Sequence, residues 1–132
     1  MQGSGGQSAT KNARSVTRNG SINLSPSWSA DGTRVAWTSY KKANPDLYIK
    51  NLRTGDTQVL SNLAGINTSP AWHPSGDRIA MARSHNGDSD IYILSTRSGE
   101  VLERVTKGGG IDVSPAWSTD GTLLAFASER SG

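Results

Sequence analysis

Short segments rich in apolar residues are separated by turn sequences along most of the chain. In the first unit of this pattern, Ala30-Asp31-Gly32 and Arg53-Thr54-Gly55-Asp56 have the composition of tight turns between strands. The segments on either side of these turns are therefore predicted to be extended. The pattern predicts four short strands in this unit, at residues 24–29, 34–39, 46–51 and 57–60.

The central strands of this unit carry apolar residues on both of their faces. Val35 and Trp37 lie on one face of the second strand, and Ala36 lies on the other face with Thr38. A sheet with one face in water would alternate more regularly between apolar and polar residues. The pattern instead favours a sheet that is packed between two similar sheets.

The same pattern occurs three times, so the chain has an internal repeat. Ser25-Pro26-Ser27-Trp28 recurs as Ser69-Pro70-Ala71-Trp72 and as Ser114-Pro115-Ala116-Trp117, with spacings of 44 and 45 residues. A four-stranded unit of this length, repeated and buried on both faces, is typical of a β-propeller blade. The predicted fold class is therefore all-β. The repeated structural positions are Pro26, Pro70, Pro115, Trp28, Trp72, Trp117, Gly32, Gly76 and Gly121.

The repeat resembles a known family. The order Ser-Pro-x-Trp, x-Gly, Ile-Ala, Asp-Ile-Tyr and Ser-Gly in residues 69–99 closely resembles the TolB-type β-propeller repeat, a WD40-like blade. The resemblance covers about residues 11–132. Such blades occur in periplasmic TolB, in propellers that precede serine-peptidase domains, and in uncharacterised secreted proteins. The resemblance implies a periplasmic or secreted compartment and a complete ring of six to eight blades.

The repeats align so that the chain starts and ends within blades. Residues 11–20 match the outer strand of a blade, residues 21–64 and 65–108 form two complete blades, and residues 109–132 match two inner strands. Residues 1–10 are rich in glycine and serine, so we interpret them as a linker or a cloning remnant. The predicted fold is a partial propeller of two full blades and one interrupted blade.

A partial propeller exposes an apolar sheet face at each end and a strand edge in its last blade. The chain length equals three periods of 44 residues, so two copies would hold six blades. We predict a homodimer in which head-to-tail contacts close one six-bladed ring, and the outer strand of one copy completes the interrupted blade of the next. A ring of seven to nine blades from three copies and a fragment of a larger protein are the alternatives.

The composition limits the classes of function. Apolar residues make up 33% of the chain, 15 of the 132 residues are glycine and none is cysteine, which excludes a helical bundle, disulfides and thiolate sites. No signal peptide is recognised at the start, and no segment is long enough for a membrane span. The net charge of +3 is spread along the chain, with only Lys41 and Lys42 adjacent, which argues against a nucleic-acid partner.

Residues that could carry catalysis or bind a metal form no recognisable site in the sequence. His73 and His85 lie in loops that we expect at opposite ends of neighbouring strands. No Gly-x-Ser-x-Gly segment is present, and the calcium-like segment Asn86-Gly87-Asp88-Ser89-Asp90 lacks a glutamate at the twelfth position. Asp31 and Asp120 are typical turn formers. We therefore predict no enzyme activity, no metal site and no cofactor.

The variable loops are the best candidates for binding, since loops on a rigid scaffold carry function. In a propeller, the loops that enter the first strand and those between the second and third strands share one rim of the channel. Asn23, Asn67 and Asp112 occupy equivalent positions at the channel mouth. The expected ligand is a peptide or a protein segment. The predicted rim residues are Asn23, Tyr40, Lys41, Lys42, Asn67, His85, Asn86, Asp88, Asp112 and Arg130.

Three functions fit these observations. The preferred one is a non-catalytic scaffold module similar to TolB that binds a peptide or protein segment at the channel rim. The second is a regulatory propeller from a serine peptidase of the prolyl oligopeptidase class. The third is an isolated or engineered propeller fragment whose only property is assembly.

Overall fold

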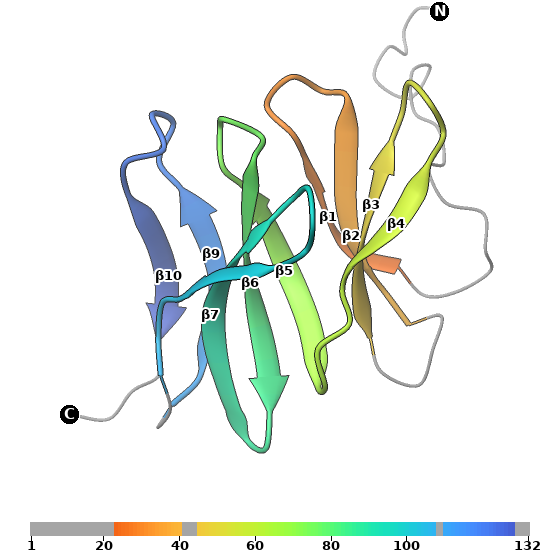
Figure 1. Ribbon diagram of the computed structural model, residues 1–132. Coiled ribbons are helices and arrows are strands. Elements are labelled where there is room, and N and C mark those ends of the chain that lie inside the picture. Colours follow the sequence, from red (N-terminus) through yellow and green to blue (C-terminus); the bar gives the residue numbers. More distant parts are fainter. Residues whose placement is uncertain (1–22, 41–44, 108–109, 129–132) are drawn as a thin grey trace, which may run out of the picture.

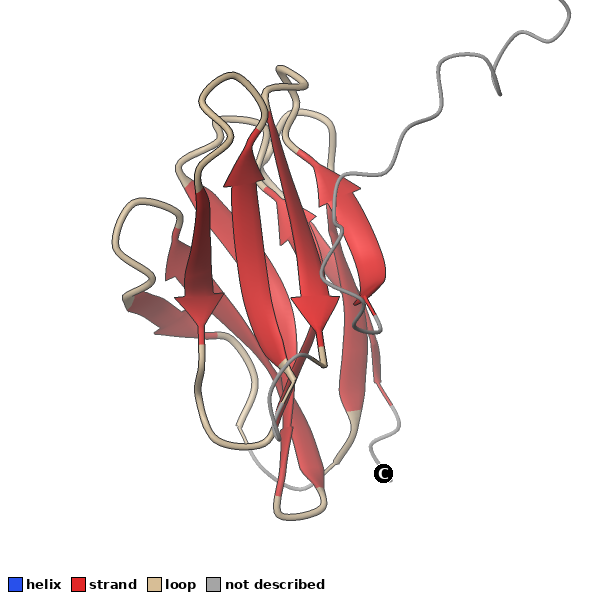
Figure 2. Ribbon diagram, turned by 90° about the vertical axis from the view of Figure 1, so that its right-hand side faces the viewer, coloured by secondary structure: helices blue, strands red, loops and turns tan. Residues whose placement is uncertain are grey.

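The structure is a computed structural model that describes residues 23–40, 45–107 and 110–128. These residues form ten strands and no helix, arranged as three antiparallel sheets that stand side by side (Figure 1). In each sheet the strands pair in chain order, so hairpins join neighbouring strands. Strands and connecting loops account for all of the described structure (Figure 2). The predicted all-β fold of antiparallel blades is confirmed.

The first complete blade is a four-stranded sheet. Its strands are β1 (Asn23–Trp28), β2 (Arg34–Ser39), β3 (Asp46–Asn51) and β4 (Thr57–Ser61). These bounds agree with the predicted strands to within one residue at each end. The turn sequences place the bounds, because Gly32 and Gly55 adopt the left-handed φ angles of 72° and 81° that tight turns need.

The second blade repeats this sheet, and a two-stranded sheet follows it. The strands are β5 (Ile66–Trp72), β6 (Arg78–His85), β7 (Asp88–Ser95), β8 (Val101–Arg104), β9 (Asp112–Trp117) and β10 (Leu124–Ser128). The predicted succession of two full blades and one half blade is confirmed. The predicted linker at residues 1–10 and the predicted outer strand at residues 11–20 lie outside the described residues.

The innermost strand of each sheet is interrupted by a β-bulge at the repeated Ser-Pro pair. In β5 the pairing with β6 shifts between Thr68 and Ala71, and Ser69 has a φ of 58°. The strand β9 has the same irregularity, with a φ of 55° at Ser114. Proline lacks the N–H group that a regular ladder uses, and a bulge leaves its position unpaired. The Ser-Pro pair therefore bends the inner strand at the same place in each blade.

The largest hydrophobic cluster lies between the first and second blades. Leu47 of the first blade and Ile79 and Leu94 of the second have no exposed surface in this cluster. Burial of each such side chain stabilises the fold by about 1.5–3 kcal/mol. On the other face of the first blade, Trp37 stacks on Tyr48 with ring centroids 5.8 Å apart, and both are buried. The predicted burial of both faces is confirmed.

Candidate functional site

Two of the predicted rim residues are buried and form hydrogen bonds inside the fold. Asn67 and Asp112 have no exposed surface. The amide nitrogen of Asn67 donates to the carbonyl oxygens of Pro45 at 3.1 Å and Leu63 at 2.7 Å, which ties the start of β5 to two loops of the first blade. The backbone carbonyl of Asp112 accepts a hydrogen bond of 2.9 Å from the hydroxyl of Ser89. These two positions therefore hold neighbouring parts of the fold together.

The other predicted rim residues are unevenly described. Tyr40 follows β2 and is 41% exposed. The side chain of Asn23, and the whole of Lys41, Lys42 and Arg130, lie outside what the structure describes. His85, Asn86 and Asp88 lie together at the hairpin between β6 and β7, and these three residues line one cavity.

This cavity, which we call the rim hollow, has a volume of about 240 Å³. Three of the residues that line it were predicted, and four come from the strands beside the hairpin. The register places Arg83 opposite Asp90 and Tyr92 opposite Arg104, so three adjacent strands contribute to one wall. The residues that line the rim hollow are Arg83, His85, Asn86, Asp88, Asp90, Tyr92 and Arg104.

Two guanidinium groups in the rim hollow lie against one aromatic ring. The central guanidinium carbons of Arg83 and Arg104 lie 5.9 and 5.7 Å from the ring centroid of Tyr92. Arg104 forms an ion pair of 2.6 Å with the nearly buried carboxylate of Asp90, and this hydrogen bond raises the pKa of Arg104. Arg83 donates to the carbonyl oxygen of Ala64 at 2.7 Å and to the Tyr92 hydroxyl at 3.4 Å.

The two arginines of the rim hollow differ in their charged partners. Arg104 is neutralised by Asp90, whereas no carboxylate of the described residues forms an ion pair with Arg83. An arginine held by a carbonyl oxygen and a phenol keeps its full positive charge. The rim hollow thus contains the guanidinium of Arg83 together with the imidazole of His85, the amide of Asn86 and the carboxylate of Asp88.

Arg83, Tyr92 and Arg104 were missed in the sequence analysis. The third-strand motif Asp90-Ile91-Tyr92 recurs in the first blade as Asp46-Leu47-Tyr48, and a repeated motif does not distinguish a binding residue from a structural one. Neither arginine has an arginine at the matching position of the first blade. The signal was the cross-strand register, which brings residues far apart in sequence onto the same face of a sheet.

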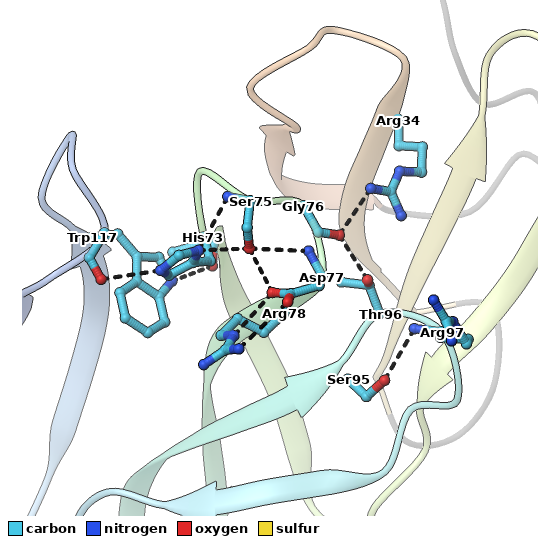
Figure 3. A network of polar contacts seen from close by, with 12 residues as sticks. Arg34, His73, Ser75, Gly76, Asp77, Arg78, Ser95, Thr96, Arg97 and Trp117 are labelled. Atoms are coloured by element: carbon cyan, nitrogen blue, oxygen red, sulfur yellow. Dashed lines mark hydrogen bonds and ion pairs between the residues drawn. The ribbon is translucent and has the colours of Figure 1, made fainter.

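A second and larger cavity lies at the other end of the first two blades, near the short turns. We call it the turn-side cleft, and its volume is about 570 Å³. Arg34 donates to the carbonyl oxygen of Gly76 at 2.8 Å, and the Thr96 hydroxyl donates to the same oxygen at 2.8 Å (Figure 3). Arg78 is paired with Asp77 at 2.9 Å. The cleft is thus lined by groups that already join the two blades.

The described residues contain no group of three or more histidine, aspartate or glutamate side chains placed to hold a metal ion. His73 belongs to the turn between β5 and β6, and His85 lies at the far end of β6, so the two imidazoles do not converge. None of the described residues belongs to a helix that could cross a membrane.

Residues 7–132, which include every strand described above, match the family model of the TolB beta propeller domain. The chain belongs to this family. The Tol-Pal system protein TolB of Desulfosudis oleivorans is 54% identical over 50 residues, which cover 38% of this chain and 11% of that protein. The crystal structure of TolB from Acinetobacter baumannii matches this TolB-type propeller with a TM-score of 0.79 and 31% identity.

The chain spans only part of these relatives. The match to the Acinetobacter baumannii TolB covers 89% of this chain and 29% of the other chain. The acylaminoacyl peptidase of Pyrococcus horikoshii has a TM-score of 0.62 at 19% identity, over 79% of this chain and 16% of that one. At that identity the likeness shows a shared fold alone.

Proposed function

We propose that this TolB-type propeller is a non-catalytic binding module that holds a peptide or protein segment at the rim hollow. The observation that supports this most is the unneutralised guanidinium of Arg83 beside the Tyr92 ring, in a cavity that also contains His85, Asn86 and Asp88. Family membership supports the same class of function, because a relative that is 54% identical over 50 residues is a Tol-Pal system protein. The periplasmic or secreted compartment implied by the family is part of this proposal.

The size of the rim hollow favours a segment of a larger partner. Sites for small-molecule ligands usually have volumes of about 300–1,000 Å³ and are mostly apolar. A volume of about 240 Å³ lined by charged and polar groups suits one or two polar side chains of a peptide. The guanidinium of Arg83 selects a segment that carries a carboxylate, since arginine binds carboxylates with two parallel hydrogen bonds.

A peptide selection tests this proposal. Random peptides displayed on phage are selected on the immobilised chain, and the affinity of the enriched peptides is measured by fluorescence anisotropy. We expect acidic peptides to be enriched, and Arg83→Gln to weaken their binding by about tenfold or more, because one charge-assisted contact is lost.

Arg97→Gln is the matched control. Arg97 is an exposed arginine at the turn-side cleft, at the other end of the sheets. The control is expected to keep the affinity within about twofold of the parent chain. If no peptide is enriched, or if both substitutions weaken binding equally, the rim hollow is not the binding site.

We further propose that a neighbour completes the ring, and that the neighbour is a second copy. Among the described residues, the first blade packs on the second blade, and β9 packs on the other side of the second blade. Each end of this row is therefore a sheet that has another described sheet on one side only. Two copies would supply the six blades of a closed homodimer.

A regulatory propeller of a serine peptidase is the second candidate. The shared fold with the Pyrococcus horikoshii acylaminoacyl peptidase is the observation that favours it. In that case the partner of the propeller would be a hydrolase domain. A peptide selection that enriched no sequence, together with binding of the chain to a separately expressed hydrolase domain, would favour this candidate over the first.

A further inference from the structure

Neighbouring blades are joined by the same tryptophan contact at both junctions of the described structure. The indole Nε1–H of Trp72 donates to the carbonyl oxygen of Ser27 at 2.9 Å. The indole Nε1–H of Trp117 donates to the carbonyl oxygen of Ala71 at 3.0 Å. In each case the acceptor is the residue just before the tryptophan of the preceding blade. The contact is therefore part of the repeat and does not depend on one blade.

A second contact accompanies the first at both junctions. Arg34 donates to the carbonyl oxygen of the turn residue Gly76 at 2.8 Å, and its guanidinium carbon lies 4.6 Å from the ring centroid of Trp72. At the next junction His73 takes this role: its Nε2 lies 3.0 Å from the carbonyl oxygen of Gly121.

The geometry defines how His73 makes this contact. The carbonyl oxygen of Gly121 can only accept, so Nε2 is the donor of this bond. The Nδ1 atom lies 3.1 Å from the backbone nitrogen of Ser75 and 2.7 Å from its hydroxyl oxygen, which fixes the orientation of the ring. Its ring meets Trp117 edge-on, with centroids 4.7 Å apart (Figure 3). Each junction thus consists of one indole N–H bond, one bond to a turn carbonyl and one side chain that covers the tryptophan ring.

We call the tryptophan and the turn that the following blade contributes the receiving half of a junction. On the first blade, no described neighbour occupies this half. Trp28, which is equivalent to Trp72, is 54% exposed, whereas Trp72 is 8% exposed. A Cβ atom added at Gly32 would meet no atom of the described residues within 4 Å, but one added at Gly76 would lie 2.8 Å from the guanidinium of Arg34. Among the described residues, nothing covers this tryptophan and this turn in the way that a neighbouring blade covers their equivalents at the other junctions.

We call the backbone carbonyl and the covering side chain that the preceding blade contributes the donating half of a junction. On the last two strands, no described neighbour occupies this half. Leu123 is equivalent to Arg34, because the backbone N–H of each donates at 3.0 Å to the serine hydroxyl that opens its turn. Leu123 is 70% exposed. Ala116, the residue before Trp117, is equivalent to Ser27 and is exposed as well. The chain thus carries both halves of one junction, at opposite ends of its row of sheets.

We infer that these two halves bind each other between copies of this chain. Leu123 of one copy covers the ring of Trp28 of the next copy, in the position that Arg34 holds over Trp72. The indole N–H of Trp28 donates to the backbone carbonyl of Ala116 of the other copy. This inference rests on the proposed self-assembly and specifies its interface. The contact is head-to-tail, so two copies use it twice and close a ring.

The chemistry of the two halves agrees with this pairing. Leu123 and Trp28 are both large apolar side chains, and mutual burial removes both from water. Two junctions of this kind already form within the chain. A second copy therefore presents a half whose backbone has the same shape as those that pair within the chain. A second copy is therefore the occupant that the geometry favours.

Substitutions of Leu123 test the inference by light scattering on a sizing column over a concentration series. The parent chain is expected at twice its mass of 14.0 kDa. Leu123→Asp removes an apolar contact from each of the two junctions between the copies. It is therefore expected to raise the dissociation constant of the dimer by about 100-fold, or about tenfold for each of these junctions. Leu123→Arg restores the arginine–tryptophan pair found at the first junction, and is expected to stay within about threefold of the parent.

Leu102→Asp is the matched control. Leu102 is 52% exposed on the outer strand β8, away from both junction halves. This variant is expected to dimerise like the parent chain. Loss of the dimer with Leu123→Arg and Leu102→Asp as well as with Leu123→Asp would indicate general association of apolar surfaces and would overturn the inference. A parent chain that is monomeric throughout the concentration series would overturn it too.

A mixing experiment tests the head-to-tail geometry. Trp28→Asp damages only the receiving half, and Leu123→Asp damages only the donating half. A pair made of one copy of each variant keeps one intact junction, so the mixture is expected to recover dimer at concentrations where each variant alone is monomeric. No recovery would contradict the head-to-tail contact. Circular dichroism of each variant separates a lost contact from a lost fold.

Failure of this inference is distinguishable from failure of the rim proposal. Peptides selected at the rim hollow report on Arg83, and the mass in solution reports on Leu123. If assembly alone fails, Leu123→Asp binds those peptides as the parent chain does. If the rim proposal alone fails, no peptide binds and the parent chain is still a dimer.

Discussion

At the scale of single residues, the turn between the two inner strands of a blade depends on one carboxylate. Asp31 accepts hydrogen bonds from the Ser29 hydroxyl at 2.8 Å, from the Thr33 N–H at 3.0 Å and from the Thr33 hydroxyl at 2.7 Å. Asp120 accepts the equivalent three bonds in the last two strands. The bond from the backbone N–H of Thr33 is the main reason that the pKa of Asp31 is lowered from 3.8 to about 2.

The second blade builds the same turn with the polar roles exchanged. Ser75 stands in the aspartate position, and its hydroxyl donates to Asp77, which stands in the threonine position. The serine that opens the turn is replaced by His73, which reaches the next blade. In the first blade the side chains of these turn residues form their described hydrogen bonds only within the hairpin, whereas His73 also bonds the turn of the next blade at Gly121. The turn role of Asp31 was predictable from sequence, whereas this role of His73 depends on which turn lies opposite.

The lowered pKa of Asp31 predicts a pH-dependent loss of stability. The carboxylate is favoured in the folded chain, so its contribution is present above about pH 4 and is lost as the pH falls towards 2. Asp31→Asn should therefore lower Tm near neutral pH, and the difference from the parent chain should vanish near pH 2. Thermal melts followed by circular dichroism over this pH range measure the effect.

The control for this prediction is Asp56→Asn. Asp56 is an exposed turn residue whose side chain accepts no hydrogen bond from the part of the chain that the structure describes. It should leave Tm close to the parent value at every pH. An Asp31→Asn difference that persists unchanged at pH 2 would show that the carboxylate charge is not the cause.

At the scale of elements, the blades are joined by a few polar contacts around a mostly apolar interface. At the first junction Arg34 makes two of these contacts at once, because its guanidinium donates to the carbonyl oxygen of Gly76 and lies over the ring of Trp72. Arg78 occupies the equivalent repeat position in the second blade, but it pairs with Asp77 of its own turn. Two arginines at one repeat position therefore have different structural roles.

This difference predicts unequal effects of two matched substitutions. Arg34→Ala removes a charge-assisted hydrogen bond and a cation–π contact between blades, and should lower the free energy of unfolding by about 1–2 kcal/mol. Arg78→Ala removes an exposed pair between adjacent residues, and should leave stability close to that of the parent chain. Urea denaturation measures both, and equal losses would contradict the assigned role of Arg34.

The elements could be predicted more fully than the contacts between them. Strand bounds follow from turn glycines and apolar runs, which are local, so β2 and β3 begin and end where the sequence indicated. Asn67 was expected at a channel surface but is buried, because the loops at Pro45 and Leu63 supply the carbonyl groups that its amide needs. The wall formed by Arg83 and Tyr92 requires a register between strands, which no local pattern contains.

At the scale of the whole molecule, the described residues form a row of three sheets with a different half-junction at each end. Trp28 marks one end and Leu123 marks the other. With the proposed contact between these ends, the chain would gain stability from its own concentration, because only the folded chain presents both halves.

Thermal melts at several protein concentrations test this consequence. Tm of the parent chain should rise steadily with concentration, and Tm of Leu123→Asp should not. Differential scanning fluorimetry over a wide concentration range is sufficient. A parent Tm that is independent of concentration would show that folding and association are not coupled.

The Ser-Pro bulge limits the pairing of the inner strands with strands of other chains. The innermost strands β1, β5 and β9 form the free inner edges of their sheets, and free edges are templates for unwanted pairing with other chains. In β5 and β9 the proline removes one donor from that edge, and the left-handed serine before it bends the strand out of register. A foreign strand could pair with only a few residues before meeting this interruption. The serine and proline that bend each inner strand thus also disfavour the addition of further strands that amyloid-like growth needs.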